Sequence, residues 1–388
     1  MAESVCAVTG QTMGGRENRL RLPNGDRQSH ARSRFWLAVT LAVISLPWSL
    51  SAQWLNQPTA GVPRTADGKP NLTAAPPKAP DGKPDLSGLW RLGIEMGVAA
   101  NITTDLAPGD IQPWAKALSR SRLESFGKDD PEVTGCLPGG PRHITRAGLA
   151  KIIQTPTLIA ILYEDLAYRQ IFLDGRSLPS DLNPSWMGYS VGHWEGETLV
   201  VESAGFNDRT WLDFAGHPHS ESLRMTERLH RRDFGHLDVQ VTLQDPGVYA
   251  KPWSVSAGGT LAADTELLEY VCAENEKDRS HLVGRTAEEK TVTVAPQVLA
   301  KYVGVYEGAT NSEVNTRGPR TVFTVTLSDG ELLLDFGAKG KVPMIPLSQT
   351  TFSPRLLGTY EFVTDDRGNV THMLVHSAEE VLKAERRR

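Results

Sequence analysis

Residues 188–253, GYSVGHWEGETLVVESAGFNDRTWLDFAGHPHSESLRMTERLHRRDFGHLDVQVTLQDPGVYAKPW, carry the pattern that decides the fold. Runs rich in β-branched and apolar residues at 198–202, 223–229 and 237–243 are separated by turn residues such as those at 194–197. This pattern is typical of short antiparallel strands joined by hairpins. The same stretch contains five of the ten histidines, so it also carries the candidate site.

The flanking sequence extends the β pattern. Further strands are expected at 152–163, 168–173 and 267–272. One early helix is expected, with Asp110 as its N-cap, Pro113 in its first turn and Gly127 as its stop signal. Helices do not alternate with strands, which argues against a parallel α/β fold. The sequence therefore predicts a mainly β domain, either an antiparallel barrel or a curved, sandwich-like sheet.

The chain divides into four segments. Residues 1–52 are an N-terminal extension with a signal peptide. Residues 53–87 contain the near-repeat ADGKPNLT and PDGKPDLS in a Pro- and Gly-rich composition that cannot bury a core, so we expect a linker or an extended arm. Residues 88–290 form the main β domain. Residues 291–388 form a small β domain with hairpins at 322–336 and 361–375 and a solvated tail at 383–388.

The N-terminal extension has the order of regions found in secretory signals. Arg32 and Arg34 precede the apolar run 35–46, and small residues follow up to Ala52. The run is short for a membrane span, although a buried helix or an uncleaved anchor would show the same apolar run. We expect cleavage, a mature chain that starts near Gln53 without a membrane span, and a periplasmic or secreted protein.

Charge and cysteine content limit the classes of partner. Cleavage after Ala52 removes six Arg against two Glu and one Asp, so the formal charge goes from −5 to −8. An acidic chain is a poor candidate for binding nucleic acid, which requires Lys and Arg. Cys136 and Cys272 are the only cysteines of the expected mature chain, which favours a disulfide over two separate buried thiols.

Several motifs resemble an abundant family of exported bacterial proteins. They include DGKPDLSGLW, CLPGGPR, GYSVGHWEGETLVVES, TWLDFAGHPHSE and DFGHLDVQVTLQDP. The family has no agreed catalytic residues, so the resemblance implies export and transfers no site. Residues 88–90, GLW, are similar to the G-x-W of lipocalin first strands, which favours a barrel. The C-terminal segment resembles the accessory β domain of secreted serine hydrolases.

The segment GHPHSE contains the main candidate site. In an extended backbone His217, His219 and Glu221 would project to one face. Two imidazoles and a carboxylate could bind a divalent metal ion or transfer protons. A hydrogen-bonded structural turn would use the same residue types, and Pro218 favours a loop or an edge strand.

Three other residues could take part in chemistry. Asp213 could orient a histidine. Ser190 is the serine of a G-x-S-x-G match, which in a nucleophile elbow follows a strand and precedes a helix. His193 lies beside it, but a strand is expected next, so a glycine-bounded turn is the competing interpretation.

These observations predict an exported protein that binds a small organic molecule and transforms it by hydrolysis or elimination. The chemistry would be acid/base or metal-assisted, and the divalent metal ion is the one cofactor the residues suggest. Two alternatives are a non-catalytic periplasmic ligand-binding or envelope-associated module, and a serine esterase that uses Ser190.

Overall fold

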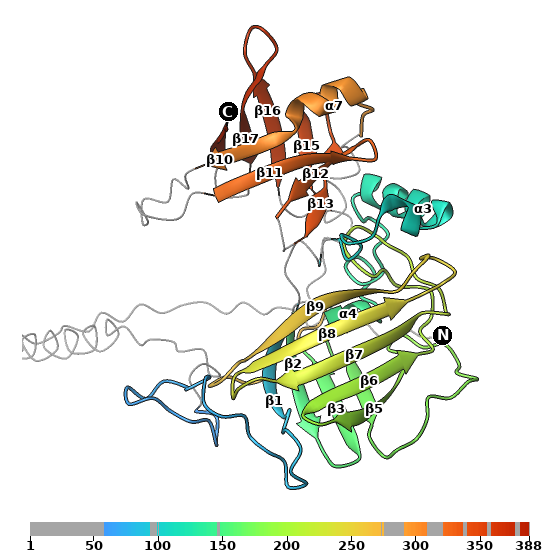
Figure 1. Cartoon of the computed structure of the whole chain (residues 1–388), viewed down its shortest axis with the longest axis vertical. Coiled ribbons are helices and arrows are strands. Elements are labelled where there is room, and N and C mark those ends of the chain that lie inside the picture. The colour runs from blue at the N-terminus through green and yellow to red at the C-terminus, as the bar shows by residue number, and fades with distance from the viewer. Residues whose placement is uncertain are drawn as a thin grey trace, which may run out of the picture. The chain divides into compact units, whose positions relative to one another are not determined.

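The computed structural model describes residues 58–93, 99, 101–145, 148–272, 274, 291–308, 321–336, 340–354, 358–376 and 381–387. They form two β-sheets with few helices (Figure 1). The predicted mainly β fold, with a barrel, an early helix and a further C-terminal sheet, is therefore confirmed. The expected signal peptide lies outside the described residues.

The first sheet is a closed barrel in the order β1 to β9. Its strands are β1 (Gly88–Gly93), β2 (Gly148–Gln154), β3 (Leu158–Tyr163), β4 (Tyr168–Phe172), β5 (Tyr189–Glu195), β6 (Thr198–Ala204), β7 (Arg224–Arg231), β8 (His236–Gln244) and β9 (Trp253–Leu261). Neighbouring strands are antiparallel except β4 and β5. These two are parallel because residues 173–188 cross from one end of the barrel to the other. Pairing of β1 with β9, for example Trp90 with Leu261, closes the ring.

The barrel forms because its strands alternate inward apolar and outward polar residues. In β8, Leu237, Val239, Val241 and Leu243 are buried while the residues between them are more exposed. Side chains of successive strand residues point to opposite faces, so this alternation fills the interior of a closed sheet. Closure also leaves no strand edge for residues 267–272, and the prediction of a strand there is wrong.

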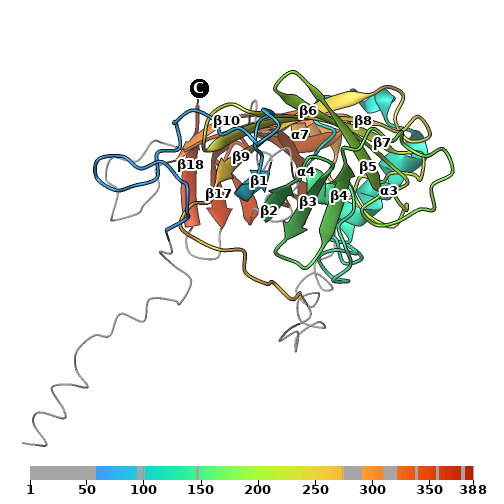
Figure 2. The ribbon, with the colours of Figure 1, turned by 90° about the horizontal axis from the view of Figure 1, so that it is seen from below.

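The two ends of the barrel are covered by different segments. At one end, helix α4 (Arg142–Thr145) lies across the ring of strands (Figure 2). The β3–β4 turn and loops 205–223 and 245–252 lie at this same end, as the strand directions require. We call it the α4 end. All the candidate site residues except Ser190 and His193 belong to its loops.

The opposite end is covered by the segment expected to be a linker or an extended arm. Its two near-repeats form equivalent tight loops, with bridges between Arg64 and Pro70 and between Lys78 and Pro84. The segment then docks on the β7–β8 turn, where Leu72 O accepts the Gly235 N–H at 2.7 Å. The composition of this arm does not support a core of its own, but its backbone is ordered by the barrel.

The structure contains the predicted early helix and the predicted cysteine pair, but the helix begins two residues later than expected. Helix α3 (Pro113–Glu124) has Gln112 as its N-cap. The predicted N-cap, Asp110, instead ends the short 3-10 helix η1 (Pro108–Asp110), so that prediction is wrong by two residues. A disulfide joins Cys136 and Cys272, with Cα atoms 5.5 Å apart, which confirms the bridge.

The second sheet has nine strands in the order β13-β12-β11-β10-β18-β17-β16-β15-β14. Its elements are α7 (Pro296–Tyr302), β10 (Gly304–Gly308), β11 (Thr321–Ser328), β12 (Glu331–Asp335), β13 (Lys341–Pro343), β14 (Ile345–Pro346), β15 (Thr351–Ser353), β16 (Thr359–Thr364), β17 (Val370–His376) and β18 (Val381–Arg386). Its core includes a stack of Tyr302 on Phe362, with ring centroids 4.3 Å apart.

Two expectations for the second sheet have opposite outcomes. The β11–β12 hairpin is confirmed, and Asp329 and Gly330 both have positive φ, as its two-residue turn requires. The expected solvated tail is wrong, because β18 lies between β10 and β17. Its buried Leu382 and Ala384 alternate with charged outward residues, which hide the strand pattern in the sequence.

Candidate functional site

Asp213 and His217 form the centre of the first candidate site, in the loop that connects β6 to β7. The Asp213 Oδ2 atom lies 2.6 Å from His217 Nδ1, and Asp213 Oδ1 accepts the His217 backbone N–H at 3.0 Å. The carboxylate also accepts the backbone N–H of Ile102 at 2.8 Å. Asp213 therefore fixes the position of the His217 ring and ties two loops of the α4 end together.

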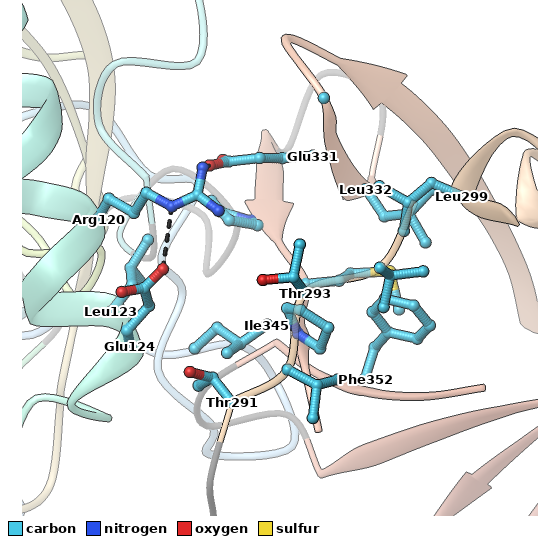
Figure 3. A pocket seen from close by; sticks show the side chains of 16 residues that line it. Arg120, Leu123, Glu124, Thr291, Thr293, Leu299, Glu331, Leu332, Ile345 and Phe352 are labelled. Carbon is cyan, nitrogen blue, oxygen red and sulfur yellow. Dashed lines mark hydrogen bonds and ion pairs between the residues drawn. The ribbon is translucent and has the colours of Figure 1, made fainter. Parts of the chain in front are cut away.

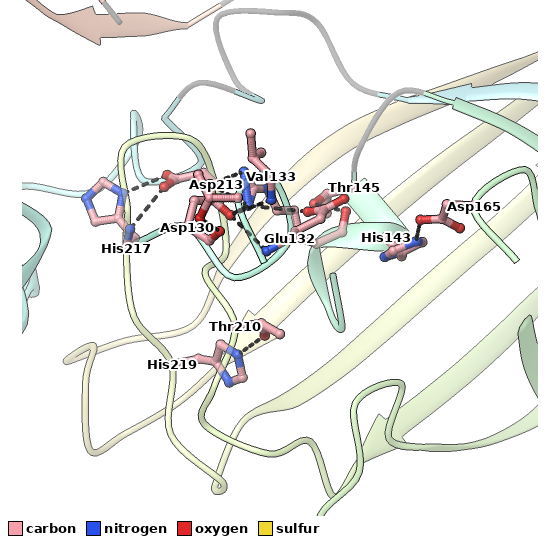
Figure 4. Close-up of polar contacts among 12 residues, drawn as sticks. Asp130, Glu132, Val133, His143, Thr145, Asp165, Thr210, Asp213, His217 and His219 are labelled. Atoms are coloured by element: carbon pink, nitrogen blue, oxygen red, sulfur yellow. Dashed lines mark hydrogen bonds and ion pairs between the residues drawn. The ribbon is translucent and has the colours of Figure 1, made fainter. Parts of the chain in front are cut away.

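The other ring nitrogen of His217 reaches a hydroxyl group. His217 Nε2 lies 3.1 Å from Thr103 Oγ1, and the Thr103 hydroxyl donates to Asn101 Oδ1 at 2.8 Å (Figure 4 shows the histidine and Asp213). Thr103 and His217 both line a surface pocket beside α3. A carboxylate, an imidazole and a hydroxyl in consecutive contact are the arrangement of hydrolase triads.

The charge state of Asp213 suits this arrangement. Burial of the carboxyl acts to raise its pKa, but the charge of His217 and the hydrogen bonds from His217 and Ile102 outweigh burial and lower the pKa. Asp213 is therefore ionised at neutral pH. An ionised carboxylate beside Nδ1 accepts the proton that this nitrogen carries and so fixes the orientation of the ring.

His219 has different partners from His217. Its Nδ1 lies 3.3 Å from the Ser220 carbonyl oxygen, so Nδ1 carries the proton, and Nε2 accepts from the Thr210 hydroxyl at 2.7 Å. The ring is 3% exposed, and burial lowers its pKa to about 4. His219 is thus neutral at pH 7, with both nitrogens engaged by the protein.

The structure does not bring His217, His219 and Glu221 together as a ligand set. Residues 216–220 form a loop rather than an extended strand, so the period-two spacing does not place the side chains on one face. The two imidazoles point to different partners (Figure 4), and Glu221 is exposed. Pro218 contributes to the loop, and its carbonyl oxygen accepts the Tyr249 hydroxyl at 2.8 Å.

Ser190 and His193 lie on β5, away from the His217 loop. Ser190 is 1% exposed, and its Oγ atom lies 3.1 Å from Arg169 Nε and 2.9 Å from Ser203 Oγ. The strand continues to Glu195 with no helix after the serine, so the context of a nucleophile elbow is missing. His193 has an exposed side chain 3.3 Å from Glu195.

Ser190 belongs to a polar network inside the barrel. Arg169 donates to Glu227 through both terminal nitrogens, and both residues are nine-tenths or more buried. Beside this pair is a cavity of about 30 Å³ that His143 and Tyr163 also line. That volume holds roughly two water molecules, whereas pockets for organic ligands measure about 300–1,000 Å³. This cavity, which described residues line, is therefore too small for an organic ligand.

Sequence reasoning missed a second histidine cluster at the α4 end, formed by Glu132, His143 and Asp165. Ligand atoms of the three residues all lie within 4.8 Å of one another. It is the one such group of His, Cys, Asp and Glu in the described part of the chain. The three residues are far apart in the sequence, so no spacing pattern could have indicated them. Thr103 was missed for the same reason.

A third pocket lies on the second sheet and is of another kind. Its lining from that sheet includes Leu299, Leu332, Ile345 and Phe352 (Figure 3). Aliphatic and aromatic side chains of this type belong to the core of the sheet. The charged groups that also line the pocket, Arg120, Glu124 and Glu331, are paired with one another. We therefore place the candidate chemistry in the loops of the barrel domain.

Comparison with known proteins adds no assignment to this geometry. No protein-family model matches the chain, and no curated protein matches its sequence. Within the described ranges, no helix has the length and hydropathy needed to cross a membrane.

Proposed function

We propose that this chain is an exported hydrolase, which acts on a small molecule with an ester-like bond at the Thr103–His217–Asp213 group. The observation that carries the proposal is the unbroken series of contacts from Asp213 Oδ2 through both nitrogens of His217 to Thr103 Oγ1, at 2.6 Å and 3.1 Å. Export is supported by the leader pattern before Ala52 and by the resemblance to exported proteins.

Each residue of the group has a defined role. The Thr103 hydroxyl turns its proton from Asn101 Oδ1 to His217 Nε2, which takes that proton as the Thr103 oxygen attacks the substrate carbonyl carbon. The resulting imidazolium is stabilised by Asp213 and returns the proton to the departing alcohol. A water molecule then attacks the acyl-threonine ester, gives a proton to Nε2 and releases the acid. Threonine and histidine are regenerated, and the net reaction consumes one water.

Charge and pocket position agree with a small substrate. The expected mature chain carries a formal charge of −8, which disfavours polyanionic substrates such as nucleic acid. Thr103 and His217 line a surface pocket, whereas the cavity of about 30 Å³ beside Arg169 and Glu227 admits only water-sized molecules. The substrate therefore approaches from the loops of the α4 end.

The test is hydrolysis of p-nitrophenyl acetate and butyrate by the protein and by single variants. His217→Gln and Thr103→Val should lower the rate by roughly a thousandfold or more, because members of such a group act as a unit. Thr103→Ser keeps a hydroxyl and should keep activity. Glu221→Gln is the matched control, since Glu221 is exposed on the same loop.

Two results would contradict the proposal. One is wild-type protein that hydrolyses neither ester above the solvent rate. The other is His217→Gln or Thr103→Val protein that is as active, per folded molecule, as the wild type. Either result would leave Asp213 as a structural tie between loops and would favour the ligand-binding module.

A further inference from the structure

A group of exposed apolar side chains lies beside the β3–β4 turn at the α4 end. The described part of the chain exposes thirteen large hydrophobic side chains, and six of them belong to this turn region or to the two segments that the disulfide joins. We call these six residues the rim patch: Leu137, Leu166, Tyr168, Leu268, Tyr270 and Val271. Single exposed apolar residues are ordinary, but a group of them marks an interaction surface.

Two bonds hold the three segments of the rim patch together. The Cys136–Cys272 disulfide, with Cα atoms 5.5 Å apart, joins the first segment to the last. The backbone N–H of Tyr270 donates to the Glu164 carbonyl oxygen at 2.6 Å, which fixes the last segment to the β3–β4 turn. The patch is therefore one region of the surface, although its residues are more than a hundred positions apart in the sequence.

Leu166 occupies a position in the turn that favours glycine. The Tyr163 N–H donates to the Ala167 carbonyl oxygen at 3.0 Å, and Leu166, the last residue of the loop between them, has a φ of 65°. Hairpin loops of this kind carry glycine at that position, because a side chain disfavours positive φ. The Leu166 side chain is also 59% exposed, so burial in the fold does not offset the strain. A strained and exposed leucine indicates a function outside the fold of the chain.

Two of the three segments are strongly acidic. Residues 164–168 and 266–274 contain five carboxylates and neither Lys nor Arg. Three of the five carboxylates form no ion pair within the described ranges, those of Glu164, Glu269 and Glu274. The border of the rim patch therefore carries negative charge beside its apolar side chains.

An apolar surface with an acidic border selects one kind of partner. An anionic lipid surface, or a second copy of this chain with its formal charge of −5, would place like charges opposite each other. A polypeptide whose apolar face lies between Lys or Arg residues places cations on the border and apolar side chains on the patch.

We propose that the rim patch binds a basic amphipathic segment of a partner polypeptide. Leu166 and Tyr270 supply apolar contact, and the carboxylates of Glu164, Glu269 and Glu274 select for the basic residues. The proposal uses none of the residues of the hydrolytic group, so either proposal can fail without the other.

The probe is a short, fluorescein-labelled helical peptide composed of leucine and lysine, and its binding to the untagged protein is measured by fluorescence anisotropy. Wild-type protein should bind this peptide and should not bind the same peptide with glutamate in place of lysine. Leu166→Asn and Tyr270→Ser should each weaken binding by roughly tenfold or more, as central residues of an interface do. The affinity should also fall as salt is added, because salt screens the charges of the border.

Two controls separate loss of the contact from loss of the fold. Asparagine tolerates positive φ better than leucine, so Leu166→Asn should melt at the wild-type temperature or above it and keep wild-type ester hydrolysis. Val381→Ser removes an exposed apolar side chain from β18, outside the rim patch, and should bind the lysine peptide as the wild type does. His217→Gln should bind the peptide normally as well.

Three outcomes would overturn the inference. The first is wild-type protein that does not bind the lysine peptide, or that binds the glutamate peptide equally well. The second is folded Leu166→Asn and Tyr270→Ser proteins that bind as tightly as the wild type. The third is wild-type protein that instead sediments with phosphatidylglycerol vesicles, or dimerises in sedimentation velocity, and loses this behaviour on Leu166→Asn. That result would assign the patch to a lipid surface or to a second copy of the chain.

Discussion

Two histidine regions at the α4 end of the barrel differ in how the chain builds them. The His217 loop takes its partners from within four residues and from a neighbouring loop, and its polar atoms are paired with protein groups. The His143 cluster collects residues from 132 to 165 and leaves Nδ1 without a partner. The first arrangement is a continuous series of contacts from a carboxylate to a hydroxyl, whereas the second leaves one buried ring nitrogen without a hydrogen-bond partner.

The largest expected effect is the loss of stability when the disulfide is removed. Replacing Cys136 and Cys272 by Ser should lower the free energy of unfolding by roughly 3–5 kcal/mol, because the bridge closes a long loop. Ester hydrolysis per folded molecule should not change.

Urea unfolding and ester hydrolysis on the same preparation measure these two quantities. A loss of hydrolysis per folded molecule would show that the region of the disulfide is coupled to the His217 loop, against this account.

The second expected effect is a dependence of stability on pH that comes from His219, the neighbour of His217. The pKa of the unfolded imidazole is near 6.5, and burial lowers the folded value to about 4. Between these values the unfolded state binds more protons, so stability falls as pH falls from about 6.5 to 4. The loss should be on the order of 3 kcal/mol.

His219→Gln removes this titration and keeps a polar side chain. The difference in unfolding free energy between wild type and variant, measured by urea titration at several pH values, should therefore shrink or change sign toward pH 4. A difference that stays constant from pH 7 to pH 4 would mean that His219 is not buried in its neutral form.

The smallest effect concerns Ser190, which the structure places in a third polar group. Ser190→Ala removes a hydroxyl that accepts from Arg169, so stability should fall by about 1–3 kcal/mol. Ester hydrolysis per folded molecule should be unchanged. An inactive, folded Ser190→Ala protein would restore the serine esterase alternative.

The sequence predicted the parts of this structure that depend on local pattern. Alternation in 223–229 and 237–243 gave β7 and β8, and the Asp-Gly turn gave the β11–β12 hairpin. Boundaries were less accurate where local signals competed, as at Asp110, which suits an N-cap but ends a 3-10 helix. Closure of the barrel depends on pairing between β1 and β9, which no local pattern encodes.

The candidate site was predictable only in part. Asp213 and His217 were suggested by being four residues apart, and the structure pairs them. The expected set of His217, His219 and Glu221 assumed an extended backbone that the loop does not have. Thr103, Glu132, His143 and Asp165 come together only through the folded chain, so their chemistry could not be read from spacing.

The most direct test of the two separate histidine regions is ester hydrolysis by the His217→Gln and His143→Gln proteins, measured per folded molecule. This account predicts that His217→Gln loses the activity and that His143→Gln keeps the wild-type rate. A wild-type rate in His217→Gln, or a lost activity in folded His143→Gln, would contradict it.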